Sequence, residues 1–371
     1  MLFIAFSITA CGNATSPTVD STVGDSSTVA DTLSLDEAIG EMLLVGFRGT
    51  AVDSTNHIYR DLRDYHVGSV ILFDYDAPTG TRGRNIKSAD QMKALCTQLR
   101  ALNPDLLIGI DQEGGNVSRL STRYGFPKTL TAQRSATLGI DSVRHQARLT
   151  AGLLASLGIN LNFAPVADVN VNPSCPVIGG MGRSFSADTA VVARCCEVWI
   201  EEQRAKGVVS CLKHFPGHGS AKGDTHKGLV DVSKTWQRRE LAPYRNIAHD
   251  NQTMVMTAHV INRQLDLSGL PASLSPRITS YLRDTLGFQG VIVTDDLAMG
   301  AISGQYSLEQ TVRMALEAGA DLLCLSNNGG HYDPDIVPKV VEIVKKLVAD
   351  GTVSEERIRQ SARRVRTLTQ K

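Results

Sequence analysis

Two short stretches of this chain combine residue types that could perform nucleophilic and acid–base chemistry. The first is the segment Lys213–Gly219 (KHFPGHG), which is followed by Asp224 and His226. An aspartate close to a histidine can fix the imidazole tautomer and raise its basicity. The second, Val291–Asp296, is an apolar run that ends in two carboxylates. We expect a nucleophilic carboxylate and a histidine acid/base to share one site.

The elements that must position these residues are eight short apolar runs, which alternate with helical segments. The runs are Leu43–Phe47, Val67–Phe73, Leu106–Asp111, Ile159–Val166, Val208–His214, Met254–His259, Val291–Asp295 and Asp321–Leu325. They are rich in Val, Ile and Leu and largely lack alternation, as strands buried on both faces do. Amphipathic helices are predicted between them at Ser88–Leu102, Ala187–Lys206 and Leu308–Ala318.

This alternation predicts an α/β fold, a single-domain (β/α)8 TIM barrel over residues 35–371. A doubly wound open sheet is the alternative, but no Gly-x-Gly-x-x-Gly fingerprint follows the first strand. A barrel places its active site at the C-terminal ends of the strands. Polar residues end five of the predicted strands: Asp111 to Glu113, Asp168, Lys213 with His214, His259, and Asp295 with Asp296. We expect them to surround one mouth suited to a hydroxyl-rich substrate.

Asp295 is the predicted nucleophile because it is the residue that the strand carries into the mouth. A carboxylate nucleophile works together with an acid that protonates the leaving group. Strand alternation turns Asp296 the other way, where we expect it to hold backbone or loop groups. His226 is the predicted acid/base, and Asp224 is expected to orient its ring.

Four motifs together resemble, in kind and order, the β-N-acetylglucosaminidase branch of family 3 glycoside hydrolases. They are Asp111–Gly115 with Arg119, Met181–Phe185, Lys213–Gly219 with Asp224–His226, and Thr294–Met299. The resemblance covers roughly residues 35 to 371 and implies the same nucleophile, Asp295. Other branches of the family carry a second domain that supplies the acid/base. This chain is too short to hold such a domain, so the resemblance implies that Asp224 and His226 supply the acid.

The remaining roles follow from the resemblance and from side-chain chemistry. Asp111 is expected to accept hydrogen bonds from sugar hydroxyls. The cationic and imidazole groups of Arg119, Arg183, Lys213 and His214 are expected to donate to the same sugar. Glu113 is expected to shape the turn after its strand, and His259 to line the pocket.

The net charge and the histidine spacing argue against nucleic-acid binding and against a metal site. A formal net charge of zero argues against nucleic-acid binding. The spacing of His214, His218 and His226 matches no common zinc motif, and Lys213 would repel a cation, so no metal or organic cofactor is expected.

The predicted function is that of a retaining exo-β-N-acetylglucosaminidase. Its substrates would be terminal β-linked N-acetylglucosamine residues of peptidoglycan fragments or chitooligosaccharides. A phosphorylase that uses phosphate in place of water is an alternative, because a histidine repels phosphate less than a carboxylate does. A catalytically inactive sugar-binding lipoprotein is the alternative from another class.

The N-terminal residues predict export and a lipid anchor. Residues 1–10 (MLFIAFSITA) resemble a signal peptide, and Ile8–Cys11 resembles a bacterial lipobox, which implies lipidation of Cys11. The polar stretch that completes residues 11–34 predicts a disordered tether. We therefore expect an exported, membrane-anchored bacterial lipoprotein, and the sequence leaves its oligomeric state open.

Overall fold

The computed structural model describes residue 2, residues 33–245, residue 247 and residues 250–369. The predicted lipidation site at Cys11 and nearly all of the predicted signal peptide and tether lie outside these residues. Among the described residues, no helix is both long enough and apolar enough to cross a membrane.

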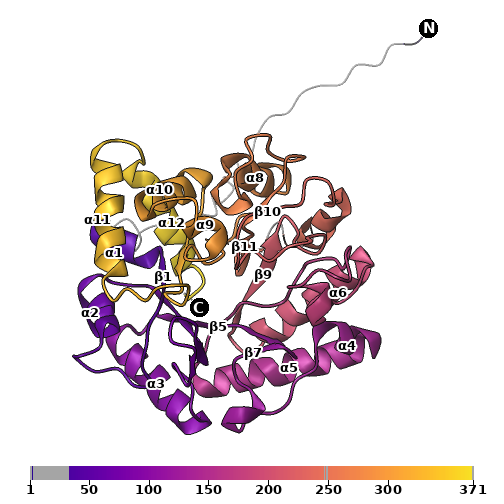
Figure 1. The fold of residues 1–371 in the computed structure, drawn as a ribbon, viewed down its shortest axis with the longest axis horizontal. Coiled ribbons are helices and arrows are strands. Elements are labelled where there is room, and N and C mark those ends of the chain that lie inside the picture. Colours follow the sequence, from indigo (N-terminus) through magenta and orange to yellow (C-terminus); the bar gives the residue numbers. More distant parts are fainter. Residues whose placement is uncertain (1, 3–32, 246, 248–249, 370–371) are drawn as a thin grey trace.

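The centre of the fold is a sheet of eight parallel strands that closes into a barrel (Figure 1). The strands are β1 (Leu43–Gly46), β2 (Ser69–Leu72), β5 (Leu107–Ile110), β8 (Leu161–Asn162), β9 (Val209–Phe215), β11 (Thr253–Thr257), β13 (Ile292–Thr294) and β14 (Leu323–Leu325). They follow one another around the ring in chain order. β14 pairs with β1, and a parallel bridge between Val293 and Leu322 joins β13 to the start of β14. The predicted barrel is confirmed. Each of its strands overlaps a predicted run, although β9 ends one residue after its run and β11 begins one residue before its run.

Helices surround the ring of strands (Figure 1). They are α1 (Leu35–Glu41), α2 (His57–Asp64), α3 (Ala89–Leu102), α4 (Ala132–Thr137), α5 (Ile140–Leu157), α6 (Thr189–Arg204), α7 (Ala242–Arg245), α8 (Pro276–Ser280), α9 (Gly300–Ser303), α10 (Leu308–Ala318), α11 (Ile336–Ala349) and α12 (Glu355–Arg366). Their ends follow local rules: the Ser88 side chain caps α3, and Gly319 ends α10 in the left-handed conformation. Short two-stranded sheets form in the loops between the barrel strands. They pair β3 (Tyr75–Asp76) with β4 (Thr81–Arg82), β6 (Gln112–Gly114) with β7 (Val117–Ser118), and β10 (Val230–Asp231) with β12 (Val260–Ile261).

Strand alternation decides which residues fill the barrel and which reach its mouth. Leu107, Val209, Cys211, Val291 and Val293 belong to one buried cluster inside the barrel. Because side chains repeat every second residue along a strand, the next inward positions after these layers are Asp111, Lys213 and Asp295. The apolar layers of the barrel therefore end in two carboxylates and one ammonium at the C-terminal end.

The opposite end of the barrel is closed by α12. Its residue Val365, and Leu368 just beyond it, pack into the cluster that fills the barrel. Arg357 and Arg364 of the same helix approach the fully buried Asp321, which lies at the start of β14. The N-terminal end of the barrel is thus sealed by apolar packing and ion pairs.

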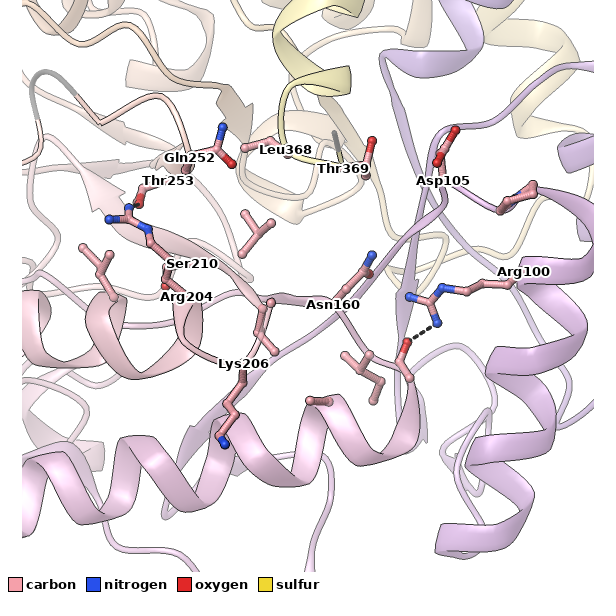
Figure 2. Close-up of a pocket in the computed structure, with 18 residues that line it drawn as sticks. Arg100, Asp105, Asn160, Arg204, Lys206, Ser210, Gln252, Thr253, Leu368 and Thr369 are labelled. Atoms are coloured by element: carbon pink, nitrogen blue, oxygen red, sulfur yellow. Dashed lines mark hydrogen bonds between the residues drawn. The ribbon is translucent and has the colours of Figure 1, made fainter. Parts of the chain in front are cut away.

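A cavity of about 710 Å³ lies at this N-terminal end (Figure 2). Figure 2 shows that its cationic side chains, Arg100, Arg204 and Lys206, lie on different sides and do not converge. Arg204 pairs with Asp250, and Arg100 donates to the carbonyl of Gly158. Both arginines are already bound within the fold, so we assign no ligand to this cavity although it is larger than the one at the mouth.

The six cysteines among the described residues are buried and free. Cys211 and Cys324 belong to the buried cluster inside the barrel. Burial raises the pKa of the Cys211 thiol, so it is held in its neutral form.

Candidate active site

A cavity of about 390 Å³ opens at the C-terminal ends of the strands. Eight residues are predicted to act in catalysis or to bind the sugar, and seven of them line this cavity: Asp111, Arg119, Arg183, Lys213, His214, His226 and Asp295. Asp224, the eighth, contacts the ring of His226. Ile71, Met256 and Cys324 line the same cavity and belong to the buried cluster inside the barrel. The cavity therefore ends against the packed barrel interior and is a blind pocket.

Asp295 stands at the end of β13 and faces this pocket. Its N–H donates to the carbonyl of Thr257 at 3.0 Å, and its Oδ1 accepts the N–H of Asp296 at 2.8 Å. Burial acts to raise the pKa of the Asp295 carboxyl, but the nearby His259 and His214 rings and the Asp296 N–H outweigh it, and the net shift is downward. The carboxylate is therefore ionised, as a nucleophile must be.

Asp296 has a structural task, as predicted. Its carboxylate accepts the N–H of Ser326 at 3.0 Å and the N–H of Ala298 at 3.2 Å. These bonds join the loop after β13 to the end of β14. They hold in place the short segment from which Asp295 projects.

A network of buried ion pairs forms one wall of the pocket. The Lys213 Nζ atom lies 2.7 Å from both Asp111 Oδ1 and Glu113 Oε1. Arg119 donates to Asp111 Oδ2 at 3.2 Å. Burial acts to raise the pKa of the Asp111 carboxyl, but Lys213 and Arg119 outweigh it and lower that pKa. The network presents oriented charged donors and acceptors, the groups best suited to fix sugar hydroxyls.

Glu113 is a member of this network, which corrects its predicted role as a turn-shaping residue. Both of its oxygens accept from Arg183, at 2.7 Å from Nε and 2.7 Å from Nη2. Sequence reasoning missed this pairing because the two residues are 70 positions apart, and no local pattern links them. Arg183 is thereby held against the pocket wall, with its Nη2 3.5 Å from His214 Nε2.

We predict that Glu113→Gln lowers the free energy of unfolding by roughly 2–4 kcal/mol, because it leaves part of a buried charge network uncompensated. Urea unfolding of the purified protein measures this change. The matched control is Glu309→Gln, which breaks the exposed pair with Lys346. That control should cost about 1 kcal/mol or less. Equal losses in the two variants would mean that the Glu113 network adds nothing beyond a surface pair.

Two strand-end residues predicted to surround the mouth lie behind it instead. Asp168 is fully buried, and its carboxylate holds the Nδ1 atom of His214 at 2.7 Å. His259 is also fully buried and is bonded to Ser273 Oγ and to the carbonyl of Asp296. The expectation that His259 lines the pocket is therefore wrong. Asp168 orients His214, which lines the pocket.

The Asp224–His226 pair lies in the loop after β9, at the open side of the pocket. Asp224 Oδ1 lies 2.8 Å from His226 Nδ1 and also accepts the His226 N–H at 2.9 Å. Burial acts to raise the pKa of the Asp224 carboxyl, but the N–H and ring of His226 outweigh it and lower it. With the Asp224 carboxylate on Nδ1, Nε2 is the ring nitrogen left to exchange a proton with a bound molecule.

The buried side chain of Glu240 packs against Gly217, in the turn that leads to the loop of Asp224 and His226. Glu240 is fully buried, and a Cβ at Gly217 would lie 2.9 Å from its Cβ and its Oε2. Gly217 has a φ of 124°, so only glycine fits here. Burial raises the pKa of the Glu240 carboxyl from 4.5 to about 7, although the N–H of Gln237 opposes this.

Because of Glu240, the folded protein should lose stability as the pH rises from about 4.5 to about 7. In this window the folded state binds a proton that the unfolded state has released, so raising the pH favours unfolding. Glu240→Gln removes the titration. We expect its free energy of unfolding to exceed that of the wild type by about 1–3 kcal/mol more at pH 8 than at pH 5. Urea unfolding at both pH values measures this, and a constant difference between the two proteins would contradict it.

The fold and this site define the class of protein, and comparison with known proteins agrees. Residues 34–368 match the model of the glycosyl hydrolase family 3 N terminal domain. The chain belongs to this family of glycoside hydrolases, as the resemblance of its motifs indicated.

Individual relatives with named activities are similar to this chain over most of its length. The chain is 35% identical over 292 residues to a β-hexosaminidase of Neisseria meningitidis serogroup C, covering 76% of each protein. Among solved structures it is similar to a family 3 β-N-acetylglucosaminidase from Paenibacillus sp. str. FPU-7, with a TM-score of 0.80 and 34% identity. That match covers 91% of this chain and 62% of the Paenibacillus chain. A β-N-acetylhexosaminidase from Beutenbergia cavernae matches with a TM-score of 0.79 and 30% identity, over 91% of this chain and 98% of that one.

Proposed function

We propose that this chain is a retaining exo-β-N-acetylglucosaminidase that works through a covalent glycosyl-aspartate and a histidine acid/base. One observation carries the proposal: Asp295 and His226 line the same blind pocket. The names of its relatives, β-hexosaminidase and β-N-acetylglucosaminidase, support N-acetylglucosamine as the sugar.

The reaction takes place in two steps. In the first, the Asp295 carboxylate attacks the anomeric carbon, the bond to the leaving oxygen breaks, and His226 Nε2 gives that oxygen its proton. In the second, His226 takes a proton from water, the water oxygen attacks the same carbon, and the bond to Asp295 breaks. Asp224 holds the ring in one tautomer through both steps.

The shape of the pocket supports exo action. Because the cavity ends against the packed barrel interior, a sugar chain cannot pass through it. Only a terminal residue can bring its anomeric carbon to Asp295 while its hydroxyls meet Asp111 and Lys213. Peptidoglycan fragments and chitooligosaccharides offer such ends, and we propose them as the substrates.

The proposed function is tested with a panel of nitrophenyl β-glycosides of N-acetylglucosamine, glucose and xylose. We expect kcat/KM to be highest for N-acetylglucosamine, with the β-anomer of the sugar released first. Preference for glucose or xylose would overturn the proposed specificity. Binding of N-acetylglucosamine without turnover of any glycoside would favour an inactive sugar-binding protein.

A phosphorylase is the second candidate, and one observation favours it. Lys227 directly follows His226 in the chain, and its charge acts to lower the pKa of the Asp224 carboxyl. Such a cation would attract phosphate to the loop that carries the acid/base. Product analysis in phosphate buffer separates the two reactions, because sugar 1-phosphate forms only by phosphorolysis.

We also propose that the protein is an exported lipoprotein anchored through Cys11. Leu33, where the described chain resumes, packs beside α12, and its carbonyl accepts from Arg359 of that helix. Leu33 therefore lies beside the helix that closes the barrel end opposite the mouth. Cys11→Ser should move the protein from the membrane fraction to the soluble fraction. Retention of this variant in the membrane fraction would contradict lipid anchoring at Cys11.

A further inference from the structure

The acid/base dyad is exposed, yet the residue between its two members is buried. The side chains of His226 and Asp224 are 66% and 22% exposed, whereas Thr225 is 3% exposed. The two bonds between Asp224 and His226 join residues of one segment. They can fix the ring tautomer, but they cannot fix the distance of the segment from Asp295. Thr225 is in a position to do so.

The Thr225 side chain contacts a buried residue, His218. Its Oγ1 lies 3.3 Å from Nε2 of His218, a residue that is 2% exposed. The His218 N–H donates at 2.7 Å to Asp168 Oδ1, and the other oxygen of that carboxylate holds His214 at 2.7 Å. Thr225 is therefore connected through His218 and Asp168 to His214, which lines the pocket.

The Thr225 backbone reaches the loop that carries the nucleophile. Its carbonyl accepts the N–H of Ala301, the second residue of α9, at 3.2 Å. Helix α9 begins soon after Asp295, and Met299 just before it also lines the pocket. The acid/base segment thus lies directly against the segment that follows the nucleophile.

Gly300 makes this close approach possible. A Cβ added at Gly300 would lie 2.7 Å from the carbonyl oxygen of His226, closer than real Cβ contacts allow. Because Gly300 has no side chain, the backbone of His226 can lie in contact with the start of α9. Any larger residue there must push the acid/base segment away or shift α9.

The protonation state of His218 suits a permanent contact. Burial lowers the pKa of its ring to about 4, although the charge of Asp168 opposes this. The ring is therefore neutral at the pH of ordinary assays. Its Nδ1 has no hydrogen-bond partner among the described residues. The contact with Thr225 is thus the side-chain hydrogen bond that His218 makes at neutral pH.

We propose that Thr225 is the positioning residue of the acid/base dyad: its hydroxyl on His218 and its carbonyl on Ala301, above Gly300, hold His226 in reach of the leaving oxygen. This inference rests on the proposed function, because it assigns His226 the role of acid. It adds that the dyad depends on a contact outside itself.

Three variants test the proposal, each assayed with a nitrophenyl β-N-acetylglucosaminide and with an alkyl β-N-acetylglucosaminide, whose leaving group needs protonation. Thr225→Val keeps the side-chain shape and removes the hydroxyl. We expect kcat/KM on the alkyl substrate to fall roughly 10- to 100-fold, the scale on which small misplacements act, while the nitrophenyl value changes little. Thr225→Ser restores the hydroxyl and should recover most of the loss. Gly300→Ala should show the same selective loss without touching the hydroxyl.

Gly228→Ala is the matched control, because a Cβ there meets nothing within 4 Å. It should leave both substrates unchanged. Equal losses on both substrates in Thr225→Val, with no recovery in Thr225→Ser, would mean a general structural role and would overturn the proposal.

The same assay on His226→Ala separates this inference from the proposed function. If His226→Ala shows the selective loss and neither Thr225→Val nor Gly300→Ala does, the acid role stands and the positioning role is wrong. If His226→Ala loses activity equally on both substrates, the acid role is wrong, and the positioning role falls with it.

Discussion

Asp295→Asn is expected to lower kcat/KM on a nitrophenyl β-N-acetylglucosaminide by roughly 10⁴-fold or more, the scale seen when a covalent nucleophile is removed. The amide has the shape of the carboxylate but is neutral, so it cannot form the glycosyl-enzyme. The fold should persist, because the asparagine carbonyl can still accept the N–H that Asp296 now gives to Asp295.

Mass spectrometry provides the direct readout for this variant. Wild-type protein mixed with a slow, activated glycoside should carry a covalent sugar on the peptide that contains Asp295, and Asp295→Asn should carry none. Asp296→Asn is the matched control: it weakens the bonds to Ser326 and Ala298, so it should lower thermal stability, yet still form the adduct. Wild-type turnover in Asp295→Asn would show that the nucleophile lies elsewhere.

His226→Ala should distinguish sharply between good and poor leaving groups. On an alkyl glycoside, whose leaving oxygen must be protonated, kcat/KM should fall by about 10²–10⁴-fold, the usual contribution of general acid–base catalysis. On a dinitrophenyl glycoside, which departs without help, kcat/KM should change little. For that substrate kcat should still fall, because the second step needs His226 to activate water.

Azide tests whether His226 acts as the base that activates water in the second step. It attacks the glycosyl-enzyme without base catalysis, so it should restore kcat of His226→Ala on the dinitrophenyl substrate and give a glycosyl azide. Asp224→Ala should follow the same pattern with a smaller effect, since it removes the group that orients the ring. If azide has no effect on either variant, His226 is not the base of the second step.

The barrel could be predicted from sequence because its signals are local. Each strand needs only a short run such as Leu43–Phe47, and each helix needs a cap such as Ser88 or Gly319 within a few residues. The inward direction of Asp295 is also local, because it follows from strand alternation through Val291 and Val293. The same local signals would predict strands and inward-facing residues in any sheet that is buried on both faces.

The roles around the pocket were only partly predictable. The types of Asp111, Lys213 and His226 were enough to nominate them, and the pocket brings them together. The role of Glu113 was not predictable, because its partner Arg183 lies in a distant loop. The place of His259 was not predictable, because a polar residue at a strand end can face a neighbouring loop as easily as the mouth.

By itself, then, the sequence predicted the eight strands, the inward direction of Asp295, and a set of groups that could attack and protonate a glycosidic bond. Only the tertiary structure decided which of those groups reach the pocket and which stand behind it. Asp168 and Asp111 both end predicted strands, yet one is fully buried on His214 and the other meets Lys213 at the pocket wall. The physical reason is that charge pairing and burial depend on neighbours brought together by barrel closure, and no spacing along the chain encodes them.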